Sequence, residues 1–391
     1  MDLCLFDSSQ WETLLPLTYT RSVADLRLGY YSIREKWEHL STGKVSIHSV
    51  DYLSPKYQGK EPYAGIMINS SVLPSLQLWD AIKVLSVNEG LMKDGTVVAY
   101  NSSEPIDPID IPQQDLKEFD AEIIIIKRYW DVFKSLEKAI ALDMEILSSK
   151  RSSKTELHAT EIIGDNIFLG EGVKINGAII NTKTGPVIIG NNAEVMEGSV
   201  IRGPFALGDH STLKMGAKIY GASSIGPHCK IGGEVSNSMF QGFSNKGHDG
   251  FVGNSVIGEW CNFGADTNVS NLKNNYSNVK VWDYGTQSYI DSEQQFCGLC
   301  MGDHSKTGIN TMLNTGTVVG VSSNVFGSGF PPKFIPSFSW GGESGFSEYD
   351  FDKAVDTAKR VMERRNIDLN AIDSDILSHI RQKEGHFFSK K

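Results

Sequence analysis

An apolar residue recurs at every sixth position through much of the second half of the chain, and this spacing limits the possible fold more than any other feature. An α-helix repeats its buried face every 3.6 residues, so a six-residue period excludes it. A short strand followed by a corner fits the period, because Gly and Asn tolerate positive φ at corners. Stacked coils would pair their backbones with neighbouring coils. The repeat therefore predicts a parallel β-helix over residues 159–327. Its apolar positions are Ile163, Leu169, Ile175, Ile189, Val195, Ile201, Leu207, Leu213, Ile219, Ile225, Ile231, Ile257, Phe263, Val269, Met301, Leu313, Val319 and Val325, with Thr307 as a polar exception.

The six-residue phase is interrupted at three places, roughly residues 176–188, 232–256 and 270–300. Insertions in a solenoid become loops on one face, and such loops tend to carry function. The middle interruption holds His248 in a Gly-rich stretch. A histidine beside a coil can act as a general base near neutral pH. We therefore take His248 as the candidate catalytic residue, against the alternative that it is an ordinary loop histidine.

These repeats resemble the hexapeptide-transferase superfamily, and the resemblance implies a left-handed helix with three hexads per coil and a homotrimer. The region after residue 245 resembles the acetyltransferase half of the bifunctional enzyme that makes UDP-N-acetylglucosamine. The matching motif is Lys246-Gly247-His248, Gly253-Asn254, Ile257-Gly258, Asn262-Phe263-Gly264-Ala265-Asp266-Thr267 and Asn271. The resemblance implies that His248 takes a proton from a sugar amine as the amine attacks acetyl-CoA. It also implies that Asn262 and Asn271 hold the sugar and the acetyl region, for which an amide that donates and accepts is suited.

A sugar phosphate needs cations nearby. The candidate substrate-binding lysines are Lys218, Lys246 and Lys273. Ungapped counting back from the histidine puts Lys218 where the family has a phosphate-binding Arg. Two positions depart from the family pattern: Phe251 replaces a substrate-contacting Tyr, and Ser236 replaces a sugar-binding Lys. Both departures concern sugar recognition, so they leave the identity of the amino sugar open.

Residues 1–150 alternate between strand-like and helix-like segments, which predicts an α/β domain with ligands at the carboxyl ends of its strands. Expected strands cover 2–6, 45–50, 64–69, 95–100 and 121–126, and expected helices cover 31–40, 77–87 and 128–148. A Ser-rich linker follows near 147–154. The predicted domains are 1–150, nucleotidyltransferase-like; 151–346, the β-helix; and 347–391, a helical tail docked on the surface.

The segment after the first strand, Leu14–Gly29, lacks the Gly-rich loop usual in sugar nucleotidyltransferases. It resembles an alternative branch of these enzymes, and the chain resembles an alternative form of the bifunctional enzyme over nearly its full length. The resemblance implies that Arg21, Arg27 and Lys36 bind a nucleoside triphosphate (NTP) and a sugar 1-phosphate, with Mg²⁺ assisting. Asp25 holds the metal or orients an Arg. Surface ion pairs are the alternative for these residues, and the metal ligands stay unassigned.

Composition narrows the remaining classes. The net charge is −10 over 391 residues with dispersed Lys and Arg, which argues against nucleic-acid binding. No apolar run is long enough to span a membrane. Five scattered cysteines without a leader sequence favour reduced thiols in the cytoplasm. Cys297 and Cys300 form one CxxC pair, which is a weak metal signal.

The leading hypothesis is an enzyme with two sites, one for acetyl transfer and one for nucleotidyl transfer. Two alternatives remain. The chain could be a sugar-1-phosphate nucleotidyltransferase with a structural β-helix, for example a thymidylyltransferase, or it could be an inactive trimeric scaffold.

Overall fold

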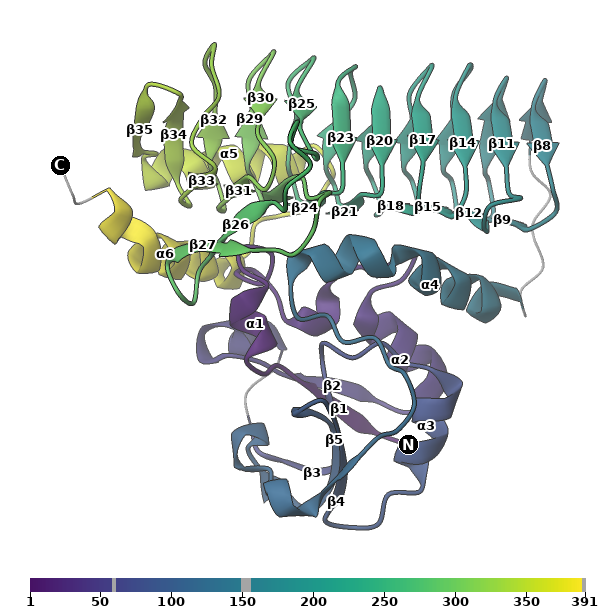
Figure 1. Ribbon diagram of the computed structural model, residues 1–391, viewed down its shortest axis with the longest axis vertical. Coiled ribbons are helices and arrows are strands. Elements are labelled where there is room, and N and C mark those ends of the chain that lie inside the picture. The colour runs from purple at the N-terminus through teal and green to yellow at the C-terminus, as the bar shows by residue number, and fades with distance from the viewer. Residues whose placement is uncertain (58–60, 149–155, 389–391) are drawn as a thin grey trace.

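The computed structural model describes residues 1–57, 61–148 and 156–388. Figure 1 shows a long β-helix lying above an α/β unit, with the C-terminal helices at one end. Both main parts follow the expected fold class: an N-terminal α/β unit, then a left-handed parallel β-helix, then a short helical C-terminal region.

The N-terminal unit is built on one mixed sheet with strand order β2-β1-β3-β5-β4-β6. Strand β1 pairs in parallel with both β2 and β3, whereas β5 is antiparallel to β3 and to β4. The strands are β1 (Leu3–Phe6), β2 (Val45–His48), β3 (Tyr63–Asn69), β4 (Glu89–Lys93), β5 (Thr96–Ile106) and β6 (Leu116–Glu118). The helices are α1 (Gln10–Thr13), α2 (Ile33–Ser41), α3 (Leu76–Lys83) and α4 (Tyr129–Ser148), with 3-10 turns η1 (Val23–Asp25), η2 (Asp51–Tyr57), η3 (Pro108–Asp110) and η4 (Gln113–Asp115).

Two expectations for this unit were wrong. Residues 121–126 form no strand, because only Ile125 makes a single bridge, to Val72. Strands β4 and β6 were missed, since their short sequences show little alternation. The start of helix α2 is marked by a local sequence signal, since Ser32 and Glu35 form a reciprocal capping box there.

Three parallel sheets form the sides of the β-helix, named here by their first strands. The β7 sheet contains β7 (Glu156–His158), β10 (Lys174–Asn176), β13 (Glu194–Val195), β16 (Thr212–Leu213), β19 (Lys230–Ile231) and β22 (Asn245–Lys246). The β8 sheet contains β8 (Glu161–Ile163), β11 (Ile179–Asn181), β14 (Val200–Arg202), β17 (Lys218–Tyr220), β20 (Glu234–Ser236) and β23 (Phe251–Gly253). The β9 sheet contains β9 (Ile167–Leu169), β12 (Val187–Ile189), β15 (Phe205–Leu207), β18 (Ser223–Ile225), β21 (Met239–Gly242), β24 (Val256–Glu259), β28 (Cys300–Met301), β31 (Val318–Val319) and β33 (Phe334–Ile335).

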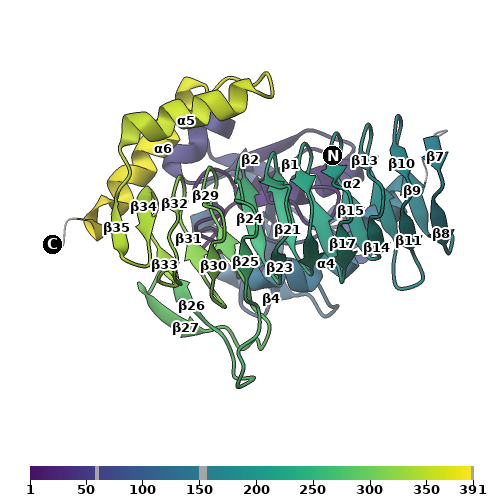
Figure 2. The ribbon, with the colours of Figure 1, turned by 90° about the horizontal axis from the view of Figure 1, so that it is seen from above.

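The later coils continue through β25 (Asn268–Val269), β29 (Lys306–Thr307), β30 (Met312–Leu313) and β32 (Asn324–Val325), and a hairpin of β34 (Ser339–Gly342) and β35 (Gly345–Glu348) ends the helix. Figures 1 and 2 show the chain passing from the β7 sheet over the upper edge to the β8 sheet, then back beneath through the β9 sheet. Progress along the axis in this sense makes the coil left-handed.

Strand register corrects details of the predicted repeat. Ile162, not Ile163, aligns with the inward Ile180, so the expected phase is off by one at its start. The interruption at 232–256 is not an insertion. Phe240 follows its partner Ile225 by 15 residues, whereas Ile225 follows Leu207 by 18, so shorter coils shift the phase. The interruption at 270–300 does extend from the coil, and it contains the hairpin β26 (Lys280–Asp283) and β27 (Ser288–Asp291).

The outer surface of the β9 sheet is the platform on which the α/β unit rests. Ile188, Ala206, Met239, Val256 and Val318 share one apolar cluster with the core of that unit. Helix α4 lies along this sheet (Figure 1) and contacts β9, β18 and β24. Burying apolar area on both surfaces is the main force that holds the two parts together.

The C-terminal helices α5 (Phe351–Glu363) and α6 (Ala371–Glu384), followed by η5 (Gly385–Phe387), pack on the molecule as expected for a docked tail (Figure 2). Ile376, Leu377 and Ile380 are buried, and α6 contacts η2 of the α/β unit.

Candidate functional sites

The turn that carries His248 lies at the edge between the β7 and β8 sheets. It joins β22 to β23, and His248 itself is exposed. Gly250 in this turn has φ +115°, and a Cβ there would lie 2.2 Å from the Thr267 carbonyl oxygen. The turn therefore requires glycine, and this requirement fixes how His248 is presented. A cavity of about 560 Å³ opens beside it, lined by Lys214, Asp249 and Asp266 among others.

Lys246 occupies an inward position of its coil. Its register partner on the neighbouring strand β19 is the apolar Ile231. Its Nζ donates to the carbonyl oxygens of Gly232 at 2.9 Å and His248 at 2.8 Å. Burial lowers the pKa of Lys246 to about 8, although Asp249 and Asp266 oppose the change. This ammonium supports the His248 turn from inside, and it does not face the solvent as a phosphate-binding side chain would.

The other predicted acetyl-site residues are spread over three sides of the helix. Asn262 is exposed on the side of the β7 sheet, where it bridges Asn245 and Lys306. Phe251 begins β23 on the β8 sheet. Asn271 lies at the opposite edge, next to the β9 sheet, and donates to Asn254 Oδ1 at 2.8 Å. One chain thus does not gather His248, Asn262 and Asn271 in one pocket.

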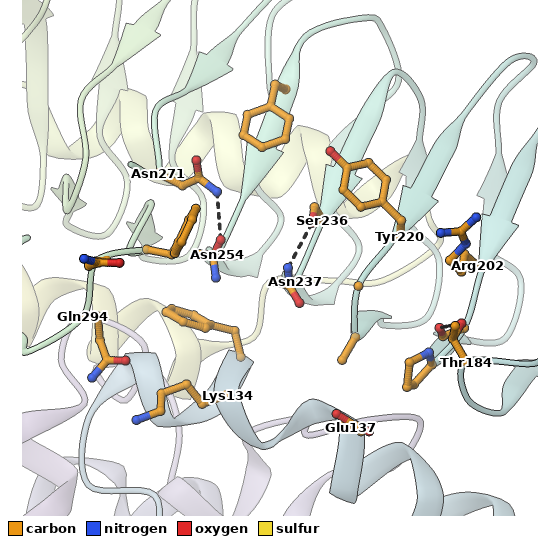
Figure 3. A pocket seen from close by; sticks show the side chains of 18 residues that line it. Lys134, Glu137, Thr184, Arg202, Tyr220, Ser236, Asn237, Asn254, Asn271 and Gln294 are labelled. Carbon is orange, nitrogen blue, oxygen red and sulfur yellow. Dashed lines mark hydrogen bonds between the residues drawn. The ribbon is translucent and has the colours of Figure 1, made fainter. Parts of the chain in front are cut away.

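A groove of about 890 Å³ runs along the edge between the β8 and β9 sheets (Figure 3). Phe251, Ser236 and Asn271 line it together with side chains that sequence reasoning missed. Those are Lys134, Glu137, Arg202, Tyr220, Asn237, Gln294, Gln295 and Phe296, and Asn254 of the matching motif joins them. Lys134 and Glu137 come from α4, where they fit an ordinary amphipathic pattern, so no sequence signal marked them.

The remaining lysine candidates differ in accessibility. Lys218 is exposed at the start of β17 on the β8 sheet. Lys273 lies in the insertion, where its Nζ donates to Ser277 Oγ at 3.3 Å and to the Asn278 carbonyl oxygen.

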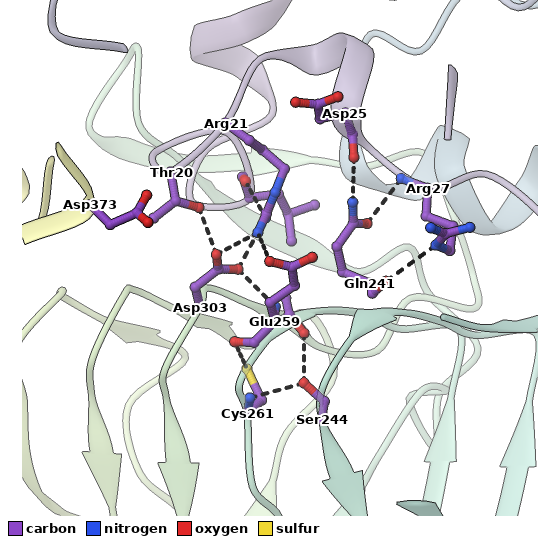
Figure 4. A network of polar contacts seen from close by, with 12 residues as sticks. Thr20, Arg21, Asp25, Arg27, Gln241, Ser244, Glu259, Cys261, Asp303 and Asp373 are labelled. Atoms are coloured by element: carbon purple, nitrogen blue, oxygen red, sulfur yellow. Dashed lines mark hydrogen bonds and ion pairs between the residues drawn. The ribbon is translucent and has the colours of Figure 1, made fainter. Parts of the chain in front are cut away.

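Arg21 is the centre of a buried network between the first loop and the β-helix (Figure 4). Its guanidinium contacts Asp303 at 3.0 and 2.5 Å and Glu259 at 3.0 Å, and Thr20 Oγ1 also donates to Asp303 at 2.7 Å. Burial alone would lower the pKa of Arg21, but Asp303 and Glu259 outweigh burial and raise it. Arg21 is only 4% exposed, so this ion pair is internal and not a surface pair.

The other predicted phosphate-binding residues of the α/β unit are also engaged. Arg27 binds the Gln241 carbonyl oxygen on the β-helix at 3.3 Å and pairs with Glu35 at 3.7 Å. Lys36 is 0% exposed and pairs with Asp143 of α4, where burial lowers the Lys36 pKa and raises the Asp143 pKa. Asp25 accepts from Tyr57 Oη at 2.7 Å and pairs with Arg34 at 2.7 Å. The structure does not bring these side chains together at one open site.

Asp7 is a site candidate that the sequence did not single out. It follows β1 directly, where the chain order crosses from β2 on one side of β1 to β3 on the other, which is where open α/β sheets bind ligands. Asp7 Oδ1 accepts from Ser22 Oγ at 2.8 Å and Val23 N at 3.0 Å, and Oδ2 accepts from Ser49 Oγ at 2.5 Å. Asp7 therefore anchors the first loop to the strand ends.

The Asp7→Asn variant is expected to gain stability at neutral pH. Burial raises the Asp7 pKa from 3.8 to about 6, although Ser49 and Ser22 limit the rise. The stability contributed by the protonated form is complete below pH 3.8 and is lost as the pH rises through 6. Chemical denaturation should show the variant more stable than wild type by up to about 3 kcal/mol at pH 7.5, with little difference near pH 4. Asp120→Asn, at an exposed carboxylate, is the control. An equal difference at both pH values would contradict the expectation.

A second cavity of about 560 Å³ lies against the β2 edge of the sheet. Its basic side chains are Arg34, Lys44, His48 and Lys56, and Tyr57 and Tyr63 add aromatic surface. Lys56 Nζ already donates to the Thr20 carbonyl oxygen at 3.1 Å. Asp2 and Glu61 also line the cavity, so its lining has a small excess of basic groups, which suits a polyphosphate better than the buried Arg21 and Lys36 do.

The described residues do not form a metal site from side chains alone. They contain no group of three or more His, Cys, Asp or Glu side chains that could hold a metal ion. Asp7 and Asp25 are already hydrogen-bonded or ion-paired, so they do not fit a preformed Mg²⁺ site. Cys297 and Cys300 are buried free thiols, and Cys297 Sγ lies 3.0 Å from Tyr129 Oη. Both cysteines therefore pack inside the protein, in agreement with the weak metal signal of the CxxC pair. Within the described residues, no helix has the length and apolar character needed to span a bilayer.

Residues 3–152 match a family model described as sugar nucleotidyl transferase. The chain is 38% identical over 144 residues to a bifunctional sugar-1-phosphate nucleotidylyltransferase/acetyltransferase of Sulfurisphaera tokodaii, covering 36% of this chain and 35% of that one. It is 37% identical over 87 residues to the bifunctional protein GlmU of Methanocaldococcus jannaschii, covering 22% and 21%. The matches thus span about a third or less of each relative's length. They bear out the resemblance to the bifunctional enzyme that the sequence showed.

Among solved structures, an Arabidopsis UDP-N-acetylglucosamine acyltransferase is similar, with 14% identity, 60% of this chain and 88% of that chain covered, and a TM-score of 0.27. The polySia-specific acetyltransferase NeuO gives 14% identity, 55% and 96% coverage, and a TM-score of 0.26. Scores this low add no argument, and the β-helix rests on the strand pairing described above.

Proposed function

We propose that this protein carries out two successive transfers in sugar-nucleotide synthesis. The β-helix moves an acetyl group from acetyl-CoA to the amine of an amino-sugar 1-phosphate. The α/β unit then moves a nucleotidyl group from an NTP to the product and releases pyrophosphate. UDP-N-acetylglucosamine is the product that the sequence resemblance favours.

The acetyl-transfer part is carried by one observation: strand β23 joins His248 at one edge of the β8 sheet to the groove at the other edge. The strand has three residues, so the Cα atoms at its ends lie about 7 Å apart. The amine and phosphate of glucosamine 1-phosphate sit on adjacent ring carbons, so a sugar placed over Phe251 would be reached by His248 from one edge of the strand and by groove side chains from the other. His248 would take the amine proton, because an ammonium cannot attack a thioester.

Asn262 faces away from this groove, so a role in the same site requires a second copy of the chain. A homotrimer, as the resemblance implies, would place the β7 side of one copy near the β8 side of the next. Acetyl-CoA would lie between copies.

The nucleotidyl-transfer part is supported by the family match and by the cavity along β2, which Arg34, Lys44 and Lys56 line. Phosphoryl transfer needs mainly positioning and charge neutralisation, which this lining would supply. Mg²⁺ is expected to be required and would be supplied with the triphosphate.

Two assays on one purified sample test the proposal. The first follows thiol release from acetyl-CoA with glucosamine 1-phosphate. The second follows pyrophosphate release from UTP or dTTP with N-acetylglucosamine 1-phosphate or glucose 1-phosphate and Mg²⁺. Thiol release together with pyrophosphate release from UTP is the expected result. Pyrophosphate release alone would favour a single-activity nucleotidyltransferase. The nucleotide that reacts, UTP or dTTP, would then identify the base that the enzyme accepts. Neither release would favour the scaffold.

A further inference from the structure

The groove in Figure 3 is closed by three parts of the chain that are far apart in the sequence. One wall is the edge of the β-helix, with Ser236, Asn254 and Asn271. The second is the insertion, with Gln294 and Phe296. The third is α4 of the α/β unit, with Lys134 and Glu137. A ligand in the groove would therefore touch both units at once.

Helix α4 is held firmly where it borders the groove. Arg128, just before the helix, pairs with Asp283 of the insertion hairpin. Tyr129 Oη lies 3.0 Å from Cys297 Sγ, and Phe133 is buried beside them. These contacts hold the backbone of α4 in place at Lys134. The Lys134 side chain therefore lines the groove from a fixed point on the helix.

The charges and rings in the groove match a phosphorylated sugar. Lys134 and Arg202 are exposed, and neither makes an ion pair among the described residues. Glu137, on the same helix as Lys134, adds one carboxylate to the lining of the groove. Amide side chains suit sugar hydroxyls, the rings of Tyr220 and Phe251 offer stacking surface, and cations bind phosphate. The groove volume is within the range of small-molecule sites.

We propose that Lys134 of α4 binds the phosphate of the amino-sugar phosphate in the β-helix site, so that the α/β unit sets the substrate preference of the acetyl-transfer reaction. The inference rests on the proposed function. It supplies a cation from α4 to the groove that Ser236 also lines, where the β-helix has serine and no lysine at position 236. Figure 3 shows Lys134 on α4, across the groove from Asn254 on the β-helix. Lys134 is a substrate-binding residue in this assignment and takes no part in proton transfer.

The test compares Lys134→Ala and Lys134→Arg with Lys138→Ala, a control on the same helix outside the groove. Losing a charge-assisted contact should raise the KM for glucosamine 1-phosphate about tenfold in Lys134→Ala, and the arginine variant should recover most of it. The kcat, the KM for acetyl-CoA and pyrophosphate release should match wild type. Calorimetry should show the same loss of affinity for glucosamine 1-phosphate but none for glucosamine.

The outcomes separate this inference from the function on which it rests. Normal acetyl transfer with an unchanged KM in Lys134→Ala overturns the inference and leaves the function standing. Sugar-phosphate binding that depends on Lys134, in a protein that transfers no acetyl group, supports the phosphate contact of Lys134 and overturns both the acetylation and its control by the α/β unit. Absence of glucosamine 1-phosphate binding in wild type overturns both.

Discussion

Replacing His248 by alanine is expected to lower kcat/KM for acetyl transfer by about 10²–10⁴-fold, because the attacking amine loses its base. The side chain is exposed on a turn whose shape depends on Gly250 and on Lys246 beneath it, so the coil should survive the change. Nucleotidyl transfer should be unaffected, because the β2 edge belongs to the other unit. The measurement is thiol release from acetyl-CoA at saturating and limiting glucosamine 1-phosphate.

A second histidine variant controls for a general effect on the coil. His210→Ala, at another exposed corner, should keep the wild-type rate of acetyl transfer. Acetyl transfer at the wild-type rate in His248→Ala would remove His248 from the mechanism and leave the groove without a base.

Replacing Arg21 by alanine is expected to destabilise the protein by about 3–5 kcal/mol, because Asp303 stays buried without its cation. Asp303 is 4% exposed. Burial alone would raise the Asp303 pKa, and Arg21 overcomes this and holds it low. Without Arg21 the carboxylate should regain its proton readily, so the loss of stability should be smaller at pH 5 than at pH 8. Chemical denaturation at both pH values measures this.

Two further variants decide how the Arg21 result is interpreted. Combining Arg21→Met with Asp303→Asn should restore part of the lost stability, since the buried charge is gone. Arg360→Ala, which removes an exposed pair on α5, should change little. If Arg21 instead serves the nucleotide, Arg21→Ala will keep its stability and lose pyrophosphate release alone, which would return this residue to the triphosphate site.

Periodicity determined much of what could be known from the sequence. The six-residue repeat specified the β-helix because each inward residue is set by its own short strand and corner, over distances of a few residues. The same locality explains why α2 and α4 were found and why the β26–β27 insertion was expected where the phase broke. Local pattern failed where coils shortened from 18 to 15 residues, since such a change resembles an insertion until the strand register is known.

Tertiary structure alone decided what the charged side chains do. Arg21 meets Asp303 across 282 positions, and Lys36 meets Asp143 across 107, and neither pairing leaves a trace in local spacing. From the sequence alone, the side chains of Arg21 and Lys36 could equally have bound a phosphate. Lys246 turned inward because its coil offered two carbonyl oxygens, and Lys134 came to the groove because apolar burial docked α4 on the β9 sheet. Repeats are encoded within a few residues, whereas the partner of a charge is fixed only when distant surfaces pack together.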